Sequence, residues 1–231
     1  MSNQPAVSSV CAIDVVSDVV CPWCWIGKGQ LDAALVRWRG RHPQAAMPEV
    51  TWHPFQLNPD LPQQGRPRGD YLDDKFGSRH AYPTERIVQA AERAGVPMRL
   101  DRIAHQPNTL RAHSLLGAAA ALGSPVQHAL ADALFRAYFV DGQDIGDETL
   151  LRGLGRQAGL PAGQIDAAFG HEALQATAAA DARARRTGVS GVPFFVIANR
   201  VGVSGAQGEQ ALLDAIEQAA RTQAAPGPSQ S

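Results

Sequence analysis

The sequence Asp18-Val19-Val20-Cys21-Pro22-Trp23-Cys24-Trp25 holds a pair of cysteines between a predicted strand and a predicted helix. A run rich in β-branched residues leads into it, which is typical of a strand. The residues after it are apolar at the i, i+3, i+4 and i+7 spacing of one helix face: Leu31, Ala34, Leu35 and Trp38. The cysteines are therefore expected where a strand ends and a helix begins.

This position predicts a reactive sulfur. The first amide groups of a helix have no partners, and the aligned peptide dipoles place partial positive charge there. A free thiol has a pKa of about 8.5, which falls to roughly 3.5–7.5 at helix N-termini or in Cys-X-X-Cys motifs. Cys21 is expected at this helix end, where its pKa would be lowered, and Pro22 suits the first helical position. Cys24 follows three residues later on the same helix face, so the two sulfurs can close and reopen a disulfide without refolding the chain.

Composition limits the classes of function. The chain has 231 residues, 45% of them hydrophobic, enough for one large domain or one domain with a substantial insertion. Its 21 basic and 22 acidic side chains nearly cancel, which gives no electrostatic reason to expect nucleic acid or an anionic membrane as a partner. No apolar run approaches the roughly 20 residues of a membrane-spanning helix. With no visible secretory signal and only three cysteines, we expect a reducing, cytoplasmic location.

Hydrophobic periodicity and turn residues predict the other elements. Pro54 falls in the second predicted strand and argues for an edge position or a bulge. Ser204-Gly205-Ala206-Gln207 has the form of a capping box ahead of the last helix. We expect strands over 10–16, 49–57, 194–198 and 201–204, a loop over 58–69, and helices over 22–40, 84–94, 108–122, 147–158, 162–169 and 172–187, with further helices marked by Leu130, Leu134, Ala137 and Tyr138 and by Leu212, Leu213, Ile216, Ala219 and Ala220.

The order of these elements predicts an α/β protein: a thioredoxin-like fold with a large inserted all-helical subdomain. Residues 10–60 and 171–222 would form the discontinuous thioredoxin-like domain. Residues 61–170 would form the helical insertion, since this block contains no convincing strand. Residues 1–9 and 223–231 are predicted to be flexible tails, because they lack the apolar residues needed for a core.

Three stretches resemble a known family. Cys21 to Gly27 (CPWCWIG), Trp52 to Pro59 (WHPFQLNP) and Gly188 to Phe195 (GVSGVPFF) resemble the DsbA family of thiol–disulfide oxidoreductases. They resemble most its FrnE-like branch, which shares a fold with kappa-class glutathione transferases and hydroxychromene-carboxylate isomerases. The sequence Gln106-Pro107-Asn108-Thr109, with Ala112-His113, is similar to a stretch of the inserted domain of that branch.

The resemblance implies several site residues. The bond between Val192 and Pro193 would be cis, which costs an X-Pro amide only about 0.5–1 kcal/mol. Pro193 would face the cysteines and present the backbone of Val192 to an extended substrate. We therefore assign Cys21 and Cys24 as catalytic, and Pro22, Trp23, Val192, Pro193 and Asn108 as substrate-binding.

Other interpretations of these residues remain open. A Cys-X-X-Cys pair can hold zinc, but a structural zinc site needs four ligands, and the histidines form no close pair, so we expect no metal. The pair could also be purely structural, and Pro193 a plain strand-starting proline. Cys11 reads either as a small buried hydrophobe or as a redox partner. Asn108 could simply cap a helix and His113 lie in the core or on the surface.

The leading hypothesis for function is thiol–disulfide exchange on a protein or small-molecule thiol or disulfide, with Cys21 as attacker and Cys24 as resolver. Trp23 supplies no charge to a thiolate, unlike the histidine between the cysteines of strongly oxidising relatives. We therefore expect a milder couple than the strongest oxidants, which lie near about −120 mV.

The alternative is a glutathione-dependent isomerase or transferase of the kappa type, although those relatives carry serine at the position of Cys21. A third class, a chaperone-like binding module that uses the helical block, would need no cysteines. No bound cofactor is expected. Glutathione is a candidate redox partner or co-substrate, and a homodimer is plausible by the resemblance.

Overall fold

The computed structural model describes residues 11–77 and 83–224, and its centre is a mixed four-stranded sheet. The strands are β1 (Ala12–Ser17), β2 (Glu49–Pro54), β5 (Phe194–Ile197) and β6 (Val201–Ser204), in the order β2-β1-β5-β6. β1 runs parallel to β2, and β5 runs antiparallel to both β1 and β6. This is the thioredoxin-like arrangement that the order of elements predicts.

The register of the sheet brings the two distant motifs together. Val16 near the end of β1 pairs with Phe194 at the start of β5. Because the two strands are antiparallel, the residues after β1 and those before β5 lie at the same end of the sheet. Val192 and Pro193 therefore come beside the segment that leads to Cys21.

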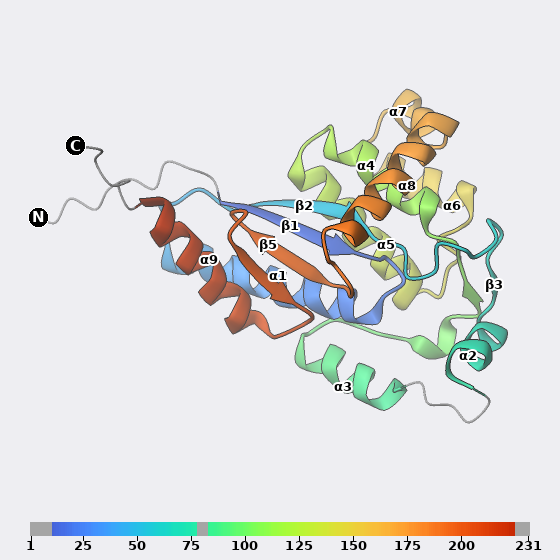
Figure 1. The fold of residues 1–231 in the computed structure, drawn as a ribbon, viewed down its shortest axis with the longest axis horizontal. Coiled ribbons are helices and arrows are strands. Elements are labelled where there is room, and N and C mark those ends of the chain that lie inside the picture. The colour runs from blue at the N-terminus through green and yellow to red at the C-terminus, as the bar shows by residue number, and fades with distance from the viewer. Residues whose placement is uncertain (1–10, 78–82, 225–231) are drawn as a thin grey trace, which may run out of the picture.

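Helices cover the sheet on both faces (Figure 1). α1 (Pro22–Arg41) packs on α9 (Glu209–Ala224) along one side, and α3 (Thr84–Arg93) packs on α1. On the other side β2 contacts α4, α5 and α8. The remaining helices of the described chain are α2 (Arg68–Phe76), α4 (Leu110–Ala120), α5 (Ser124–Phe139), α6 (Glu148–Gln157), α7 (Ala162–Ala168) and α8 (His171–Arg186).

The inserted segment is mainly helical, but it contains strands that the sequence did not predict. Within the expected loop over 58–69 lies β3 (Arg66–Pro67), which pairs with β4 (His105–Gln106). A short 3-10 helix over Leu100–Arg102 precedes β4. Each strand has two residues, too few to give the alternation by which a strand is recognised in sequence.

Several predicted boundaries need correction. β2 ends at Pro54 rather than at residue 57, and it is an edge strand, as the proline suggested. The capping box at Ser204 is wrong, because α9 begins only at Glu209. Gln207 instead donates from its side chain to the carbonyl of Ser204 at 2.9 Å. The predicted flexible tail begins too early, since α9 continues to Ala224, and positions 1–10 and 225–231 lie outside the described residues.

One continuous core joins the sheet to the inserted helices. Trp25 of α1 is fully buried and stacks on Phe135 of α5, with ring centroids 5.4 Å apart. Its indole nitrogen donates to the carbonyl of Pro97 at 2.9 Å. The insertion is thus packed against the sheet rather than tethered to it. Across 11–77 and 83–224, every helix is too short or too polar to span a bilayer.

Candidate active site

The turn between β1 and α1 holds the cysteine pair as the sequence predicts. Cys21 is the N-cap residue of α1, and its backbone amide donates to the carbonyl of Asp18 at 3.0 Å. The carbonyl of Cys21 accepts from the amides of Cys24 at 3.0 Å and Trp25 at 3.2 Å. No side chain caps this helix end, and its first turn has no acidic residue. The Cys21 sulfur therefore lies at the partial positive charge of the helix N-terminus without a competing capping or acidic side chain from the first turn of α1.

The Cys21 thiol directly contacts the motif that contains Val192 and Pro193. It donates to the carbonyl of Val192 at 3.7 Å, and the Val192–Pro193 bond is cis, as the family resemblance implies. Pro193 packs closely on α1: a Cβ added to Gly27 would come within 2.9 Å of the proline Cγ. Glycine at this position therefore allows α1 to approach Pro193.

The two sulfurs differ in environment. Cys24 is 1% exposed and Cys21 is 4% exposed, although Cys21 also lines a cleft. Burial raises the pKa of the Cys24 thiol well above its ordinary value of 9.0, interaction with Cys21 raises it further, and a hydrogen bond with the Asp18 backbone acts in the opposite direction. Cys24 is thus the sulfur kept as a thiol, behind the one that faces the cleft.

The third cysteine takes no part in this site. The carbonyl of Cys11 accepts from the amide of Glu49, where β1 and β2 begin, whereas Cys21 follows the other end of β1. Burial raises the pKa of the Cys11 thiol, which fits the interpretation as a small buried hydrophobe. Over the described part of the chain, no three His, Cys, Asp or Glu side chains are close enough to hold a metal ion.

A cleft of about 320 Å³ opens beside Cys21. Of the residues predicted to bind substrate, Pro22, Trp23 and Val192 line it, whereas Pro193 is buried and does not. Its far wall comes from the inserted segment, mainly from α2 and α3. The other lining residues are Val20, Leu57, Asn58, Arg68, Tyr71, Lys75, Phe76, Pro83, Ile87, Gln106 and Gly191.

The far wall carries positive charge. The Lys75 amine donates to the Tyr71 hydroxyl at 2.7 Å and to Asn58 Oδ1 at 3.1 Å. Arg68 is buried and donates to Gln106 Oε1 at 3.2 Å and to the Tyr138 hydroxyl at 3.0 Å. The cleft therefore combines an apolar floor near Cys21 with the Lys75 cation, which suits a carboxylate. Sequence reasoning missed Arg68, Tyr71 and Lys75. The one local signal was the i, i+4 spacing of Tyr71 and Lys75.

The predicted binding residue Asn108 lies elsewhere. Its side-chain oxygen accepts from the amide of Leu110 at 2.9 Å, and its side-chain nitrogen donates to the carbonyl of Leu61 at 2.7 Å. It does not line the Cys21 cleft. Asn108 therefore lies just before Thr109, the N-cap residue of α4, and its side chain joins the first turn of α4 to the loop of Leu61.

His113 of α4, by contrast, contacts the turn between β1 and α1 that precedes the cysteine pair. The His113 Nε2 atom lies 3.2 Å from Asp18 Oδ1, and both side chains are almost completely buried. The other carboxylate oxygen of Asp18 accepts from the amide of Leu57 at 2.7 Å. Asp18 thereby connects the cysteine turn to α4 of the inserted segment, a role that the sequence did not predict.

Comparison with known proteins agrees with this geometry. Residues 12–217 match the DSBA-like thioredoxin domain, which is most of the chain. The chain belongs to this family. It is 28% identical to the uncharacterized protein YwbO of Bacillus subtilis (strain 168) over 207 residues, which cover 88% of this chain and 94% of YwbO.

Solved structures give the same result. A probable DsbA oxidoreductase of Streptomyces coelicolor, SCO1869, superposes with a TM-score of 0.78 at 29% identity, covering 95% of this chain and 97% of that one. Cytosolic disulfide reductase DsbM of Pseudomonas aeruginosa, solved with GSH, gives 0.65 at 23% identity, with coverage of 91% and 99%. A 2-hydroxychromene-2-carboxylate isomerase gives 0.62 at 14% identity, with coverage of 92% and 98%. The last two likenesses concern the fold, which the FrnE-like branch shares with them.

Proposed function

We propose that this protein is a thiol–disulfide oxidoreductase that uses the Cys21–Cys24 pair. The observation that carries the proposal is the placement of the two sulfurs. Cys21 lies at an uncapped helix N-terminus, against Val192 and on the wall of a cleft. Cys24 lies buried behind it with a raised pKa. One sulfur is placed to meet a substrate, and the other is shielded from it.

The reaction follows from this placement. The Cys21 thiolate attacks one sulfur of a substrate disulfide, so that a mixed disulfide forms and the other substrate sulfur leaves as a thiolate. Cys24 loses its proton and attacks the Cys21 sulfur, which closes the Cys21–Cys24 disulfide and releases the second substrate thiolate. The protons of the two cysteines pass to the released thiolates. Two electrons have moved from the protein to the substrate, and the reverse sequence would oxidise a dithiol.

The lining of the cleft suits substrates in which a disulfide lies next to a carboxylate. Apolar side chains surround Cys21, whereas Lys75 supplies a cation at the far wall. Disulfides of glutathione have this chemistry, and DsbM was solved with GSH. We propose glutathione as the redox partner: two glutathione thiols reduce the Cys21–Cys24 disulfide to the dithiol and leave as glutathione disulfide, in a reducing, cytoplasmic compartment. A homodimer stays a prediction.

Exchange activity of cysteine variants tests the proposal. Cys21→Ser should lose disulfide reduction with a small neutral disulfide such as bis(2-hydroxyethyl) disulfide, because the attacking sulfur is gone. Cys11→Ser is the matched control and should retain the rate of the parent, since Cys11 lies at the other end of β1. Full activity in the Cys21 variant would refute the proposal.

The reduction potential tests the direction. With Trp23 rather than a charged residue between the cysteines, the pair should be less oxidising than about −120 mV. Titration of the Cys21–Cys24 pair against glutathione buffers measures this value. A potential at or above that extreme would contradict the expectation.

A glutathione-dependent isomerase or transferase is the second candidate, favoured by the cationic far wall and by the likeness of fold to the isomerase. In that chemistry the thiolate belongs to glutathione, so Cys21 and Cys24 would be dispensable. Calorimetry of glutathione with the Cys21→Ser/Cys24→Ser variant separates the two candidates. Tight binding, combined with no disulfide exchange by the parent protein, would favour the second.

A further inference from the structure

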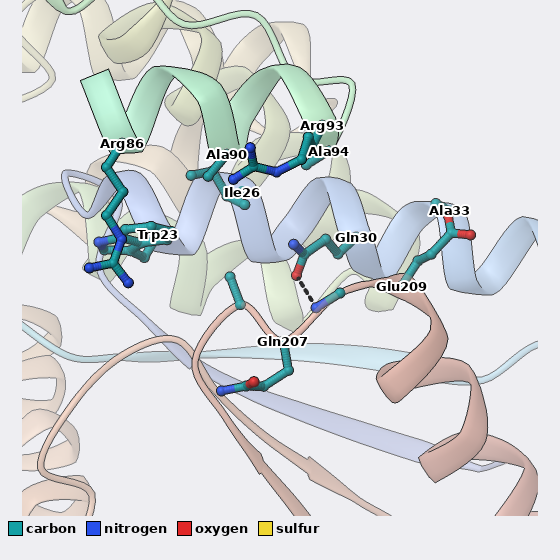
Figure 2. Close-up of a pocket in the computed structure, with 12 residues that line it drawn as sticks. Trp23, Ile26, Gln30, Ala33, Arg86, Ala90, Arg93, Ala94, Gln207 and Glu209 are labelled. Carbon is teal, nitrogen blue, oxygen red and sulfur yellow. Dashed lines mark hydrogen bonds between the residues drawn. The ribbon is translucent and has the colours of Figure 1, made fainter. Parts of the chain in front are cut away.

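A second groove lies on the other side of Trp23. It has a volume of about 460 Å³ and runs between α1, α3 and the loop from β6 to α9. Trp23 lines both this groove and the Cys21 cleft, so the two lie on either side of the residue between the cysteines. Figure 2 shows Trp23 at one end of the groove, with α3 above and the loop of Gln207 below.

Two arginines of α3 give this groove its charge. Arg86 and Arg93 are exposed, and both side chains extend from α3 toward α1 (Figure 2). Arg86 lies over the Trp23 ring at 5.7 Å, a stacking that orients the guanidinium and leaves its N–H groups available. Within the described residues, neither arginine forms an ion pair.

The acidic residue of the groove is already neutralised. Glu209 lies at the far end beside Ala33 (Figure 2), and its carboxylate accepts from Arg37 at 2.8 Å. Glu85 and Glu92, also on α3, do not line the groove. The opposite wall is polar and uncharged, with Gln207 and with Gln30, whose side-chain oxygen accepts from the amide of Gly208 at 2.9 Å. The lining is therefore positive on balance.

The spacing of the two arginines suits an extended chain. They lie seven positions apart, which corresponds to a rise of about 10 Å along α3. An extended polypeptide covers that distance in about three residues. Side chains on one face of an extended chain recur every second residue, so acidic side chains two or four positions apart lie about 7 or 13 Å apart. These distances bracket the separation of the arginines, so one bound segment could meet both guanidinium groups. A chain that enters past Trp23 would have its cysteine next to Cys21.

We propose that the groove of Arg86 and Arg93 binds an acidic segment of polypeptide substrates, next to the cysteine that reacts with Cys21. The loop below the groove supports this link, because the amide of Gly205 donates to the carbonyl of Pro193 at 2.8 Å. This hydrogen bond fixes the loop that lines the groove relative to Pro193, which follows the Val192 contacted by Cys21. This proposal rests on the proposed oxidoreductase function and assigns its substrates.

Single-turnover kinetics with the reduced full-length protein test the proposal. Two short peptides of matched length each carry one cysteine as a mixed disulfide with 2-mercaptoethanol. One has glutamates at alternate positions on each side of the cysteine, so that either chain direction presents acidic side chains on one face to the groove, and the other has glutamines there. Reaction oxidises the Cys21–Cys24 pair and releases the peptide thiol and 2-mercaptoethanol. Bis(2-hydroxyethyl) disulfide reports on Cys21 alone.

The parent protein should react about five- to tenfold faster with the acidic peptide, since two exposed ion pairs contribute modestly and act mainly on association. Added salt should reduce this preference. The variant Arg86→Gln/Arg93→Gln should lose it and keep the rate with the small disulfide. The control Arg156→Gln/Arg200→Gln loses the same charge at exposed positions outside the groove and should keep the preference.

Three results would overturn the proposal. They are equal rates of the parent with both peptides, an equal loss in the control variant, and reaction with the small disulfide but with neither peptide. Failure of the parent to react with all three substrates would instead refute the oxidoreductase function itself. The two failures are therefore distinguishable.

Discussion

The two sides of the Cys21 cleft are built in different ways. The thioredoxin-like side consists of contiguous motifs at the ends of β1 and β5, where Cys21 and Val192 meet through the sheet register. The inserted side consists of single residues from α2, α3 and β4, such as Lys75 and Ile87. The first side supplies the sulfur chemistry, and the second shapes what can reach it. The difference predicts that changes on the two sides affect different steps.

The strongest test of how the two sides depend on each other is their buried connection at Asp18 and His113. Asp18→Ala should destabilise the fold by about 2–6 kcal/mol, because the buried His113 ring and the Leu57 amide each lose a hydrogen-bond partner, at about 1–3 kcal/mol for each. Urea unfolding measures the change.

A control for this prediction lies on the same strand. Asp14 pairs with His53 at 2.6 Å, but both side chains are partly exposed. Asp14→Ala should therefore cost no more than about 1 kcal/mol. Equal losses in the two variants would show that the Asp18 connection does not hold the two sides together.

The burial of Cys24 predicts a pH effect on the thioredoxin-like side. Burial raises the pKa of Cys24 well above 9.0. Up to pH 9.0, the fraction of Cys24 present as thiolate should therefore rise about tenfold per pH unit and should not level off. Iodoacetamide labelling of Cys24 in the Cys21→Ser variant measures this, with free cysteine as the reference. A plateau below pH 9.0 would contradict the burial argument.

The same shift has a sign for stability. Since the folded protein holds the Cys24 proton more tightly than the unfolded chain does, stability should fall as the pH rises through 9.0. The Cys24→Ala variant should lose this part of the pH dependence.

The smallest effect is expected on the inserted side. Lys75→Gln removes the cation that faces the cleft without touching the cysteines. KM for glutathione disulfide should rise a few-fold, as about 0.5–1 kcal/mol for an exposed ion pair implies, while the rate with bis(2-hydroxyethyl) disulfide stays unchanged. Steady-state kinetics with both disulfides check this. A loss of rate with the neutral disulfide would place Lys75 in the chemistry instead.

The same division explains what the sequence could predict. Cys21 and Cys24 lie in a short motif whose place between a strand and a helix follows from local strand and helix signals. Pro193 was singled out by the family resemblance, which implied the cis bond. Lys75 and Arg68 line the cleft only because α2 folds back over the cysteine turn, which no local pattern encodes. His113 meets Asp18 across 95 positions of sequence, and that contact depends on how α4 packs. Two-residue strands such as β3 are too short to show a period.

Trapping glutathione on one cysteine is the most direct test of the proposal that Cys21 is the attacking residue. A Cys24→Ser variant, treated with glutathione disulfide and analysed by mass spectrometry after proteolysis, should carry glutathione on Cys21, because no second sulfur can release it. Cys11 should remain unmodified, since it is buried at the other end of β1. An adduct on Cys11, or none on Cys21, would contradict the assignment of Cys21 as the attacking residue.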